Sequence, residues 1–107
     1  MAVRVRRGKA DKAVKQLVQA LEKYQQDHPK AKIDLYRHSR FSVRIRVIDP
    51  GFAKVNLGER SSRVWKYFDD LPDEVVSDIT MLLLLTPKEL KTSLGNVEFE
   101  HPTPLEL

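Results

Sequence analysis

The chain of 107 residues contains no cysteine, which excludes disulfide bonds, thiolate metal sites and cysteine nucleophiles. No apolar run approaches the ~20 residues needed to cross a bilayer. The longest one, residues 81–85, has the length of a strand. The N-terminal residues MAVRVRR lack the apolar stretch of a signal peptide. We therefore expect one domain without a membrane segment, located in the cytoplasm.

Charge is distributed unevenly along the chain. Residues 1–46 contain 13 Lys and Arg against 4 Asp and Glu, whereas residues 47–107 contain 6 against 11. Two interpretations are open. Either one end of the folded domain attracts polyanions, or the two halves attract each other across the fold.

The first half predicts one helix and a hairpin. Between residues 9 and 28, apolar residues recur at the three-and-four spacing of a helix face, and Pro29 ends that helix. Residues 32–38 and 41–48 alternate between apolar and polar side chains, which predicts two strands. Arg44 and Arg46 fall on the polar face of the second strand, away from the apolar face that is expected to meet the helix.

The second half predicts a helix, a strand and a short final helix. Asn56, with Glu59 three residues later, has the pattern of a helix N-terminus. Residues 79–85 are apolar on both faces, as in a buried strand, although periodicity alone does not exclude a helix there. The letters TPKE at 86–89 begin a short helix that is expected to end at Gly95. The expected fold is an α+β sandwich, α-β-β-α-β-α, with a three-stranded mixed sheet. Residues 1–8 are assigned to a basic arm, 9–95 to the domain and 96–107 to a tail. Within the arm, Val3 and Val5 alternate with Arg4 and Arg6, so the alternative of a strand at a sheet edge stays open.

Three motifs in the middle of the chain carry a family resemblance: VIDPGF at 47–52, LGER at 57–60 and VWKYF at 64–68. Together with residues 79–89, their order and spacing resemble the BolA family across roughly residues 10–94. The resemblance implies a fold related to type II KH domains. It also implies two activities: partnership with a monothiol glutaredoxin around an iron–sulfur cluster, and nucleic-acid binding.

The sequence departs from the family at the positions that hold the cluster. The family has a histidine after the Glu-Arg pair, and here that residue is Ser61, a poor iron ligand. His38, in the loop joining the first two strands, is the only weak candidate for the second ligand. Gly51 and Gly58 do not have the spacing of the KH backbone-clamping loop. We therefore expect no cofactor and no metal.

A basic surface remains the first functional prediction. Basic residues with one tyrosine among them predict salt-sensitive phosphate binding and base stacking by the arm and the outward strand face. The set is Arg4, Arg6, Arg7, Lys9, Tyr36, Arg37, Arg40, Arg44 and Arg46. The open alternative is a charged strand face whose arginines pair with the acidic second half.

The second functional prediction is a protein-interaction module that contributes no cluster ligand of its own. Its partner would be a glutaredoxin or another iron–sulfur carrier, and its contact residues would be Phe52, Arg60 and Tyr67. These aromatic residues also fit the core, because aromatics at helical spacing usually pack inward. No spacing of nucleophile, histidine and acid matches a catalytic motif, so we expect a protein without enzymatic activity.

Overall fold

The computed structural model describes residues 3–8 and 10–102. The helices and strands follow in the order β1 (Val3–Val5), α1 (Lys12–Asp27), β2 (Lys32–Ser39), β3 (Ser42–Ile48), α2 (Leu57–Trp65), α3 (Asp73–Val76), β4 (Ile79–Leu85) and α4 (Leu94–Glu100). Short 3-10 turns occur at Pro50–Phe52, Lys66–Phe68 and Glu89–Lys91.

The four strands form one mixed sheet in the order β1-β2-β3-β4. β1 runs parallel to β2, β2 antiparallel to β3, and β3 parallel to β4. A central hairpin is therefore flanked by two strand–helix–strand crossovers, one through α1 and one through α2 and α3. This topology leaves β1 and β4 as the two edges of the sheet.

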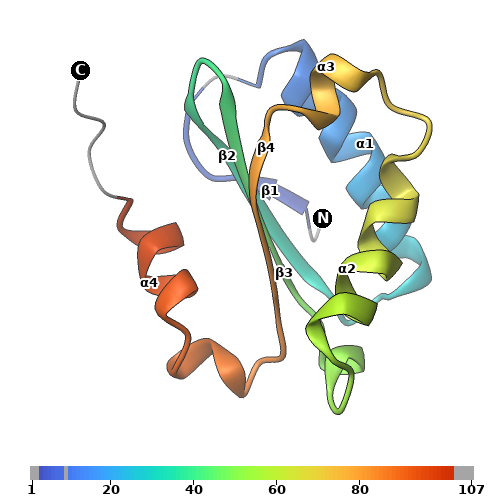
Figure 1. Cartoon of the computed structure of the whole chain (residues 1–107), viewed down its shortest axis with the longest axis vertical. Coiled ribbons are helices and arrows are strands. Elements are labelled where there is room, and N and C mark those ends of the chain that lie inside the picture. Colours follow the sequence, from blue (N-terminus) through green and yellow to red (C-terminus); the bar gives the residue numbers. More distant parts are fainter. Residues whose placement is uncertain (1–2, 9, 103–107) are drawn as a thin grey trace.

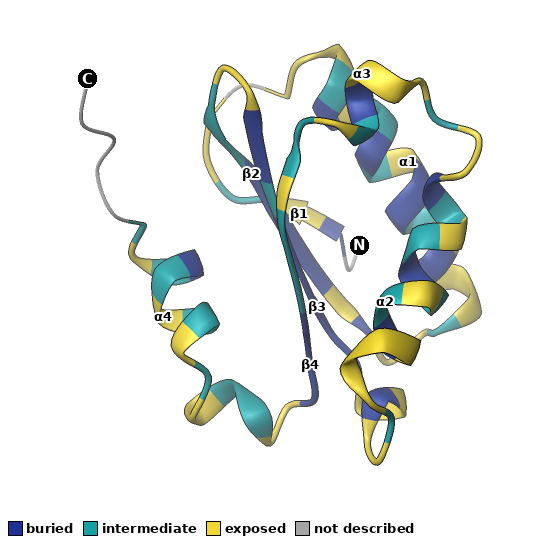
Figure 2. Ribbon diagram, in the orientation of Figure 1, coloured by how far each residue is buried: buried dark blue, intermediate teal, exposed yellow. Residues whose placement is uncertain are grey.

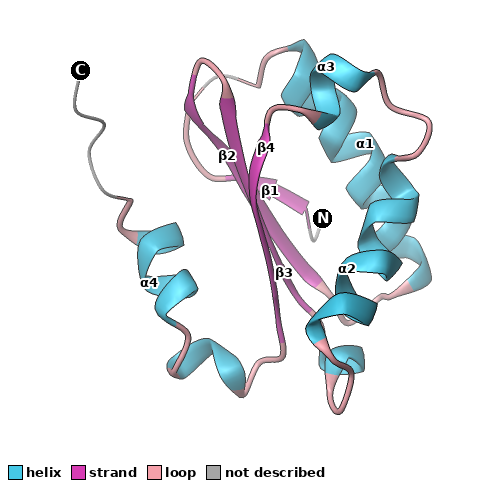
Figure 3. Cartoon of the chain, in the orientation of Figure 1, coloured by secondary structure: helices cyan, strands magenta, loops and turns pink. Residues whose placement is uncertain are grey.

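The helices cover both faces of the sheet unequally (Figure 1). α1, α2 and α3 lie on one face, and α4 lies alone on the other. Figure 3 shows the same three layers by element type, with the sheet between them. The main core lies between the sheet and α1–α2, where burial is most continuous in Figure 2, and it includes Leu17, Tyr24, Ile45, Phe52 and Phe68.

Local capping contacts explain where the main helices begin. The Asp11 carboxylate accepts a hydrogen bond from the Val14 N–H at 3.0 Å and starts α1. The Asn56 side chain accepts one from the Glu59 N–H at 2.8 Å and starts α2. α1 ends before Pro29, as the sequence predicts.

The mixed α+β class predicted from the sequence is confirmed, and the predicted hairpin and buried strand lie at 32–48 and 79–85. The sheet has four strands rather than three. The additional strand β1 comes from the residues assigned to a basic arm, where Val3 is buried against the core and Arg4 faces outward. The predicted KH-like arrangement is not confirmed by this sheet.

The C-terminal part also differs from the prediction. TPKE at 86–89 does form reciprocal hydrogen bonds between Thr86 and Glu89, but only a 3-10 turn follows. The helix begins at Leu94, capped by Ser93, so that Gly95 lies near its start and residues 96–100, assigned to a tail, are helical. Residues 103–107 of that tail lie outside the described residues.

Candidate functional site

The polar face of β3 lies beneath α4, which carries acidic and amide side chains toward it. Arg46 is only 5% exposed. Its guanidinium donates to the Asp34 carboxylate at 2.6 Å, to the side-chain amide oxygen of Asn96 at 2.7 Å and to the Glu100 carboxylate. It also lies 4.7 Å from the ring centroid of the buried Phe99. This arginine is therefore enclosed between the sheet and α4.

Two further arginines of the predicted surface form ion pairs with α4. Arg44 pairs with Glu98 at 3.1 Å, and Arg6 pairs with Glu100 at 2.5 Å. Contact with Arg6, and then with Arg46, lowers the pKa of the Glu100 carboxyl to about 2. In the last turn of α4, Glu98 and Glu100 are at the helix end where negative charge is unfavourable. The arginines of the sheet compensate for this.

The other members of the predicted basic set are divided between buried and exposed positions. Tyr36 is fully buried and donates its hydroxyl to the Phe99 carbonyl at 2.7 Å. Arg37 pairs with Asp11 and Asp78, both at 2.9 Å. Three members remain exposed: Arg4, paired with Asp34, Arg7, which lies over the Tyr36 ring, and Arg40 at the hairpin tip. Lys9 lies outside the described residues.

The strand face predicted to be outward is therefore not open to solvent. Its arginines pair with Asp34 and with acids of the second half, which is the alternative that the charge distribution left open. The physical reason is that Phe99 docks on Tyr36 and carries Glu98 and Glu100 onto the arginines. Nucleic-acid binding itself stays a prediction, but the strand-face part of its proposed surface, with Tyr36 and Arg46, is covered, whereas Arg4, Arg7 and Arg40 are exposed.

The three predicted partner-binding residues have structural contacts instead of forming one exposed surface. Phe52 is fully buried in the core. Arg60 is 5% exposed, donates to the Leu84 carbonyl at 3.1 Å and pairs with Glu89 at 2.7 Å. That contact lowers the pKa of Glu89 to about 2.

The third of these residues, Tyr67, is half-buried. Its hydroxyl donates to Asp27 at 2.5 Å. Burial and this hydrogen bond raise the pKa of Tyr67 to about 12. The helical spacing of the aromatic residues predicts that they pack in or near the core. It does not predict the ion pair between Arg60 and Glu89, which are far apart in the sequence.

The two positions related to the family's cluster ligands lie apart. Ser61 is in α2, whereas His38 lies near the end of β2, beside the hairpin turn. The hairpin turn and the start of α2 lie at opposite ends of the sheet (Figure 1). Burial, and then the charge of Arg44, lower the pKa of His38. Within residues 3–8 and 10–102, no group of three His, Asp or Glu side chains is arranged to hold a metal ion.

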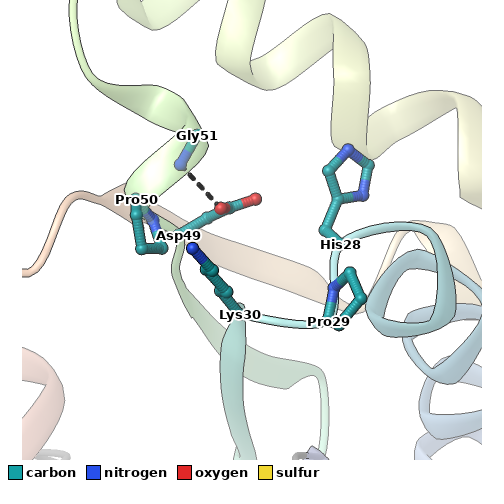
Figure 4. Close-up of a pocket in the computed structure, with 6 residues that line it drawn as sticks. All are labelled: His28, Pro29, Lys30, Asp49, Pro50 and Gly51. Carbon is teal, nitrogen blue, oxygen red and sulfur yellow. Dashed lines mark hydrogen bonds between the residues drawn. The ribbon is translucent and has the colours of Figure 1, made fainter.

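A shallow pocket joins the α1–β2 connection to the turn after β3 (Figure 4). His28, Pro29 and Lys30 line one side, and Asp49, Pro50 and Gly51 line the other. The Asp49 carboxylate accepts hydrogen bonds from the Tyr24 hydroxyl at 2.7 Å and from the Gly51 N–H at 2.8 Å.

The Asp49 and His28 side chains of this pocket already form hydrogen bonds or stacking contacts within the protein. Burial and the neighbouring Asp49 raise the pKa of Tyr24. The His28 ring stacks on Tyr24, with centroids 4.1 Å apart, and its Nδ1 lies 3.0 Å from the Tyr24 carbonyl oxygen. Asp49 is only 3% exposed and already accepts two hydrogen bonds, so it is poorly placed to act as a general base.

A second hollow, which we call the edge groove, runs along β4 at the edge of the sheet. It is lined by uncharged residues only: Leu57 and Ser61 of α2, Leu82, Leu83, Leu84 and Leu85 of β4, and Ser93. Leu57 is 71% exposed, and Leu94, next to Ser93, is 86% exposed. In Figure 1, β4 is drawn in front of the other strands and no helix crosses it. The sequence predicts β4 as a strand covered on both faces, but its local pattern does not show that β4 has no second neighbouring strand in the part of the chain that the structure describes.

Comparison with family models, with curated proteins and with solved structures finds no match. The BolA-like resemblance therefore stays a prediction. Among the described residues, no helix is long and apolar enough to span a bilayer.

Proposed function

We propose that the protein is a non-catalytic interaction module that binds another polypeptide at the edge groove. The observation that carries this proposal is the combination of an edge strand with an uncharged, partly exposed lining, in a chain of which 32% is charged. Soluble proteins usually protect edge strands with charged side chains, prolines or a covering element. Exposed apolar surface around such a strand is typical of protein-binding sites.

The mode of binding that fits this groove is strand addition. An extended segment that lies along β4 hydrogen-bonds to its outer backbone groups, while Leu57 and the neighbouring apolar side chains contact the side chains of that segment. Of the two functions expected from the sequence, this is the interaction module. Burial of Arg46 and Tyr36 beneath α4 makes the nucleic-acid adaptor the less supported one.

Substitution in the groove, with a matched control, tests this function. Leu57→Glu adds a charge to the groove at an exposed position, so the fold is expected to persist. Phe41→Glu makes the same kind of change at the hairpin tip, where Phe41 is 72% exposed. We expect proteins captured from the native cell by the wild-type chain to be retained by Phe41→Glu and lost with Leu57→Glu.

Two outcomes would count against the proposal. Capture that is equal for both variants would show that partners do not use the groove. Capture that is abolished by nuclease treatment would instead favour the nucleic-acid adaptor. A glutaredoxin among the captured proteins would support the partner that the family resemblance implies.

A further inference from the structure

The outer backbone groups of β4 can be assigned from its hydrogen bonds. The Leu85 carbonyl accepts from the Asp49 N–H at 2.9 Å, so Leu85 directs its backbone groups toward the β3 side. Because backbone groups alternate along a strand, Leu83 does the same, whereas Leu82 and Leu84 direct theirs to the open side. Arg60 of α2 confirms this direction, since it donates to the Leu84 carbonyl. Leu82 therefore presents a backbone donor and an acceptor at the sheet edge.

We infer that the edge groove binds a second copy of this chain, through antiparallel pairing of the two β4 strands about a two-fold axis at Leu82. In this arrangement the Leu82 N–H of each copy donates to the Leu82 carbonyl of the other. The Leu84 N–H of each copy also faces the outer backbone of the other near Thr80. The same surface then serves on both sides of the contact, as a closed dimer requires. This inference rests on the proposed function and names its partner.

Charge around β4 selects the antiparallel arrangement. The segment before the strand, residues 69–78, contains five acids and no Lys or Arg, and four of these acids are exposed: Asp69, Asp70, Asp73 and Glu74. After the strand, Lys88 and Lys91 are exposed, and Glu89 is held by Arg60. Antiparallel pairing places the acidic segment 69–78 of each copy beside Lys88 and Lys91 of the other copy, so that the dimer contains two such contacts.

The uncharged lining of the edge groove is compatible with binding a second, identical groove. Its lining is uncharged from Leu57 to Ser93, so no like charges meet when two identical surfaces approach. The β3–β4 pairing is irregular at its beginning, since Val43 pairs with Ile79 and Arg44 pairs with Met81, leaving Thr80 extra. The regular part from Met81 onward is short. We therefore expect a dimer that dissociates at about 1–100 µM rather than a permanent one.

A proline substitution at the axis tests the pairing directly. Leu82→Pro removes the N–H that faces the partner and leaves the bonds to β3 in place, because proline is tolerated on the open side of an edge strand. Leu82→Ala is the matched control, since it also removes the leucine side chain but keeps the N–H. By sedimentation equilibrium we expect Leu82→Pro to weaken the dimer about thirtyfold relative to Leu82→Ala, because two hydrogen bonds are lost per dimer.

Charge reversal provides a second test that does not depend on how proline affects folding. Lys88→Glu and Glu74→Lys are each expected to weaken the dimer at low salt, and the chain carrying both is expected to recover it. In the wild type, hydrogen exchange at the Leu82 N–H is expected to slow as protein concentration rises.

Several outcomes would overturn the inference. These are a wild-type chain that stays monomeric up to about 1 mM, a dimer unaffected by Leu82→Pro, or two charge reversals whose effects add instead of cancelling. A monomeric chain that still captures another protein through Leu57 would refute the self-pairing and leave the proposed function standing. A β4 dimer whose other cellular partners are captured equally by Leu57→Glu would leave the self-pairing standing and show that those other partners bind elsewhere.

Discussion

Removing the charge of Glu100 measures how strongly α4 is held to the sheet. The substitution Glu100→Gln keeps the shape of the side chain and removes the carboxylate that pairs with Arg6 and Arg46. The pKa of Glu100 falls from 4.5 to about 2 in the folded protein. Each pKa unit corresponds to about 1.4 kcal/mol, so the charge contributes about 3 kcal/mol at most.

The side chain of Glu100 is 28% exposed, so solvent screening reduces this figure. We expect Glu100→Gln to lower the free energy of unfolding by about 2 kcal/mol at pH 7, or Tm by about 10 °C. The control Glu59→Gln removes a carboxylate from the exposed pair with Arg63 and is expected to cost about 0.5 kcal/mol or less.

The effect depends on pH with a definite sign. Because folding depresses the pKa, the stabilisation is complete above pH ~4.5 and is lost as the pH falls toward 2. Urea unfolding of wild type and Glu100→Gln should therefore give curves that converge between pH 4.5 and 2. Glu89 titrates in the same window in both proteins, so their difference isolates Glu100. No difference at pH 7, or one that persists undiminished at pH 2, would refute the assigned ion pairs.

The remaining predictions concern three other buried polar groups. Tyr24→Phe removes the hydroxyl that donates to Asp49 and should cost about 1–3 kcal/mol in urea unfolding at pH 7; a change below ~0.5 kcal/mol would contradict this hydrogen bond. Arg60→Ala leaves the Leu84 carbonyl without this donor and Glu89 without its paired cation, and should cost about 3 kcal/mol, measured by thermal unfolding; an unchanged Tm would exclude that role. Arg46→Glu places a negative charge between carboxylates and should abolish folding as judged by circular dichroism, whereas a folded variant would show that α4 leaves this face readily.

The parts of the fold that the sequence predicts are those with a clear apolar period. α1, the hairpin and β4 each bury several apolar side chains on one or both faces, and the pattern follows from that burial. α4 offers no such signal, because Leu94 and Val97 are exposed and Phe99 is its one fully buried apolar side chain. β1 has only three residues, and the alternation of Val3 and Val5 with Arg4 and Arg6 is too short to distinguish an edge strand from a loose arm.

The candidate site was harder to predict because its determinants are distant in the chain. Alternation correctly places Arg44 and Arg46 on the face of β3 opposite the main core, but it does not show that α4, 50 or more residues later, covers them. Likewise, the composition of residues 79–85 predicts a strand, while its position at an edge depends on the order of the whole sheet. Both the covering of these arginines by α4 and the edge position of β4 depend on contacts between distant parts of the chain, which a local sequence pattern does not predict.

The two edges of the sheet differ in a way that limits the size of any assembly. β1 is three residues long and carries the exposed Arg4, so it is a poor template for another strand, whereas β4 has seven residues, none of them charged. A sheet in which both edge strands can pair with another chain adds copies at each edge and grows into a fibre. With pairing at β4 alone, as proposed above, assembly stops at two copies, so an apolar edge strand does not lead to an open-ended polymer.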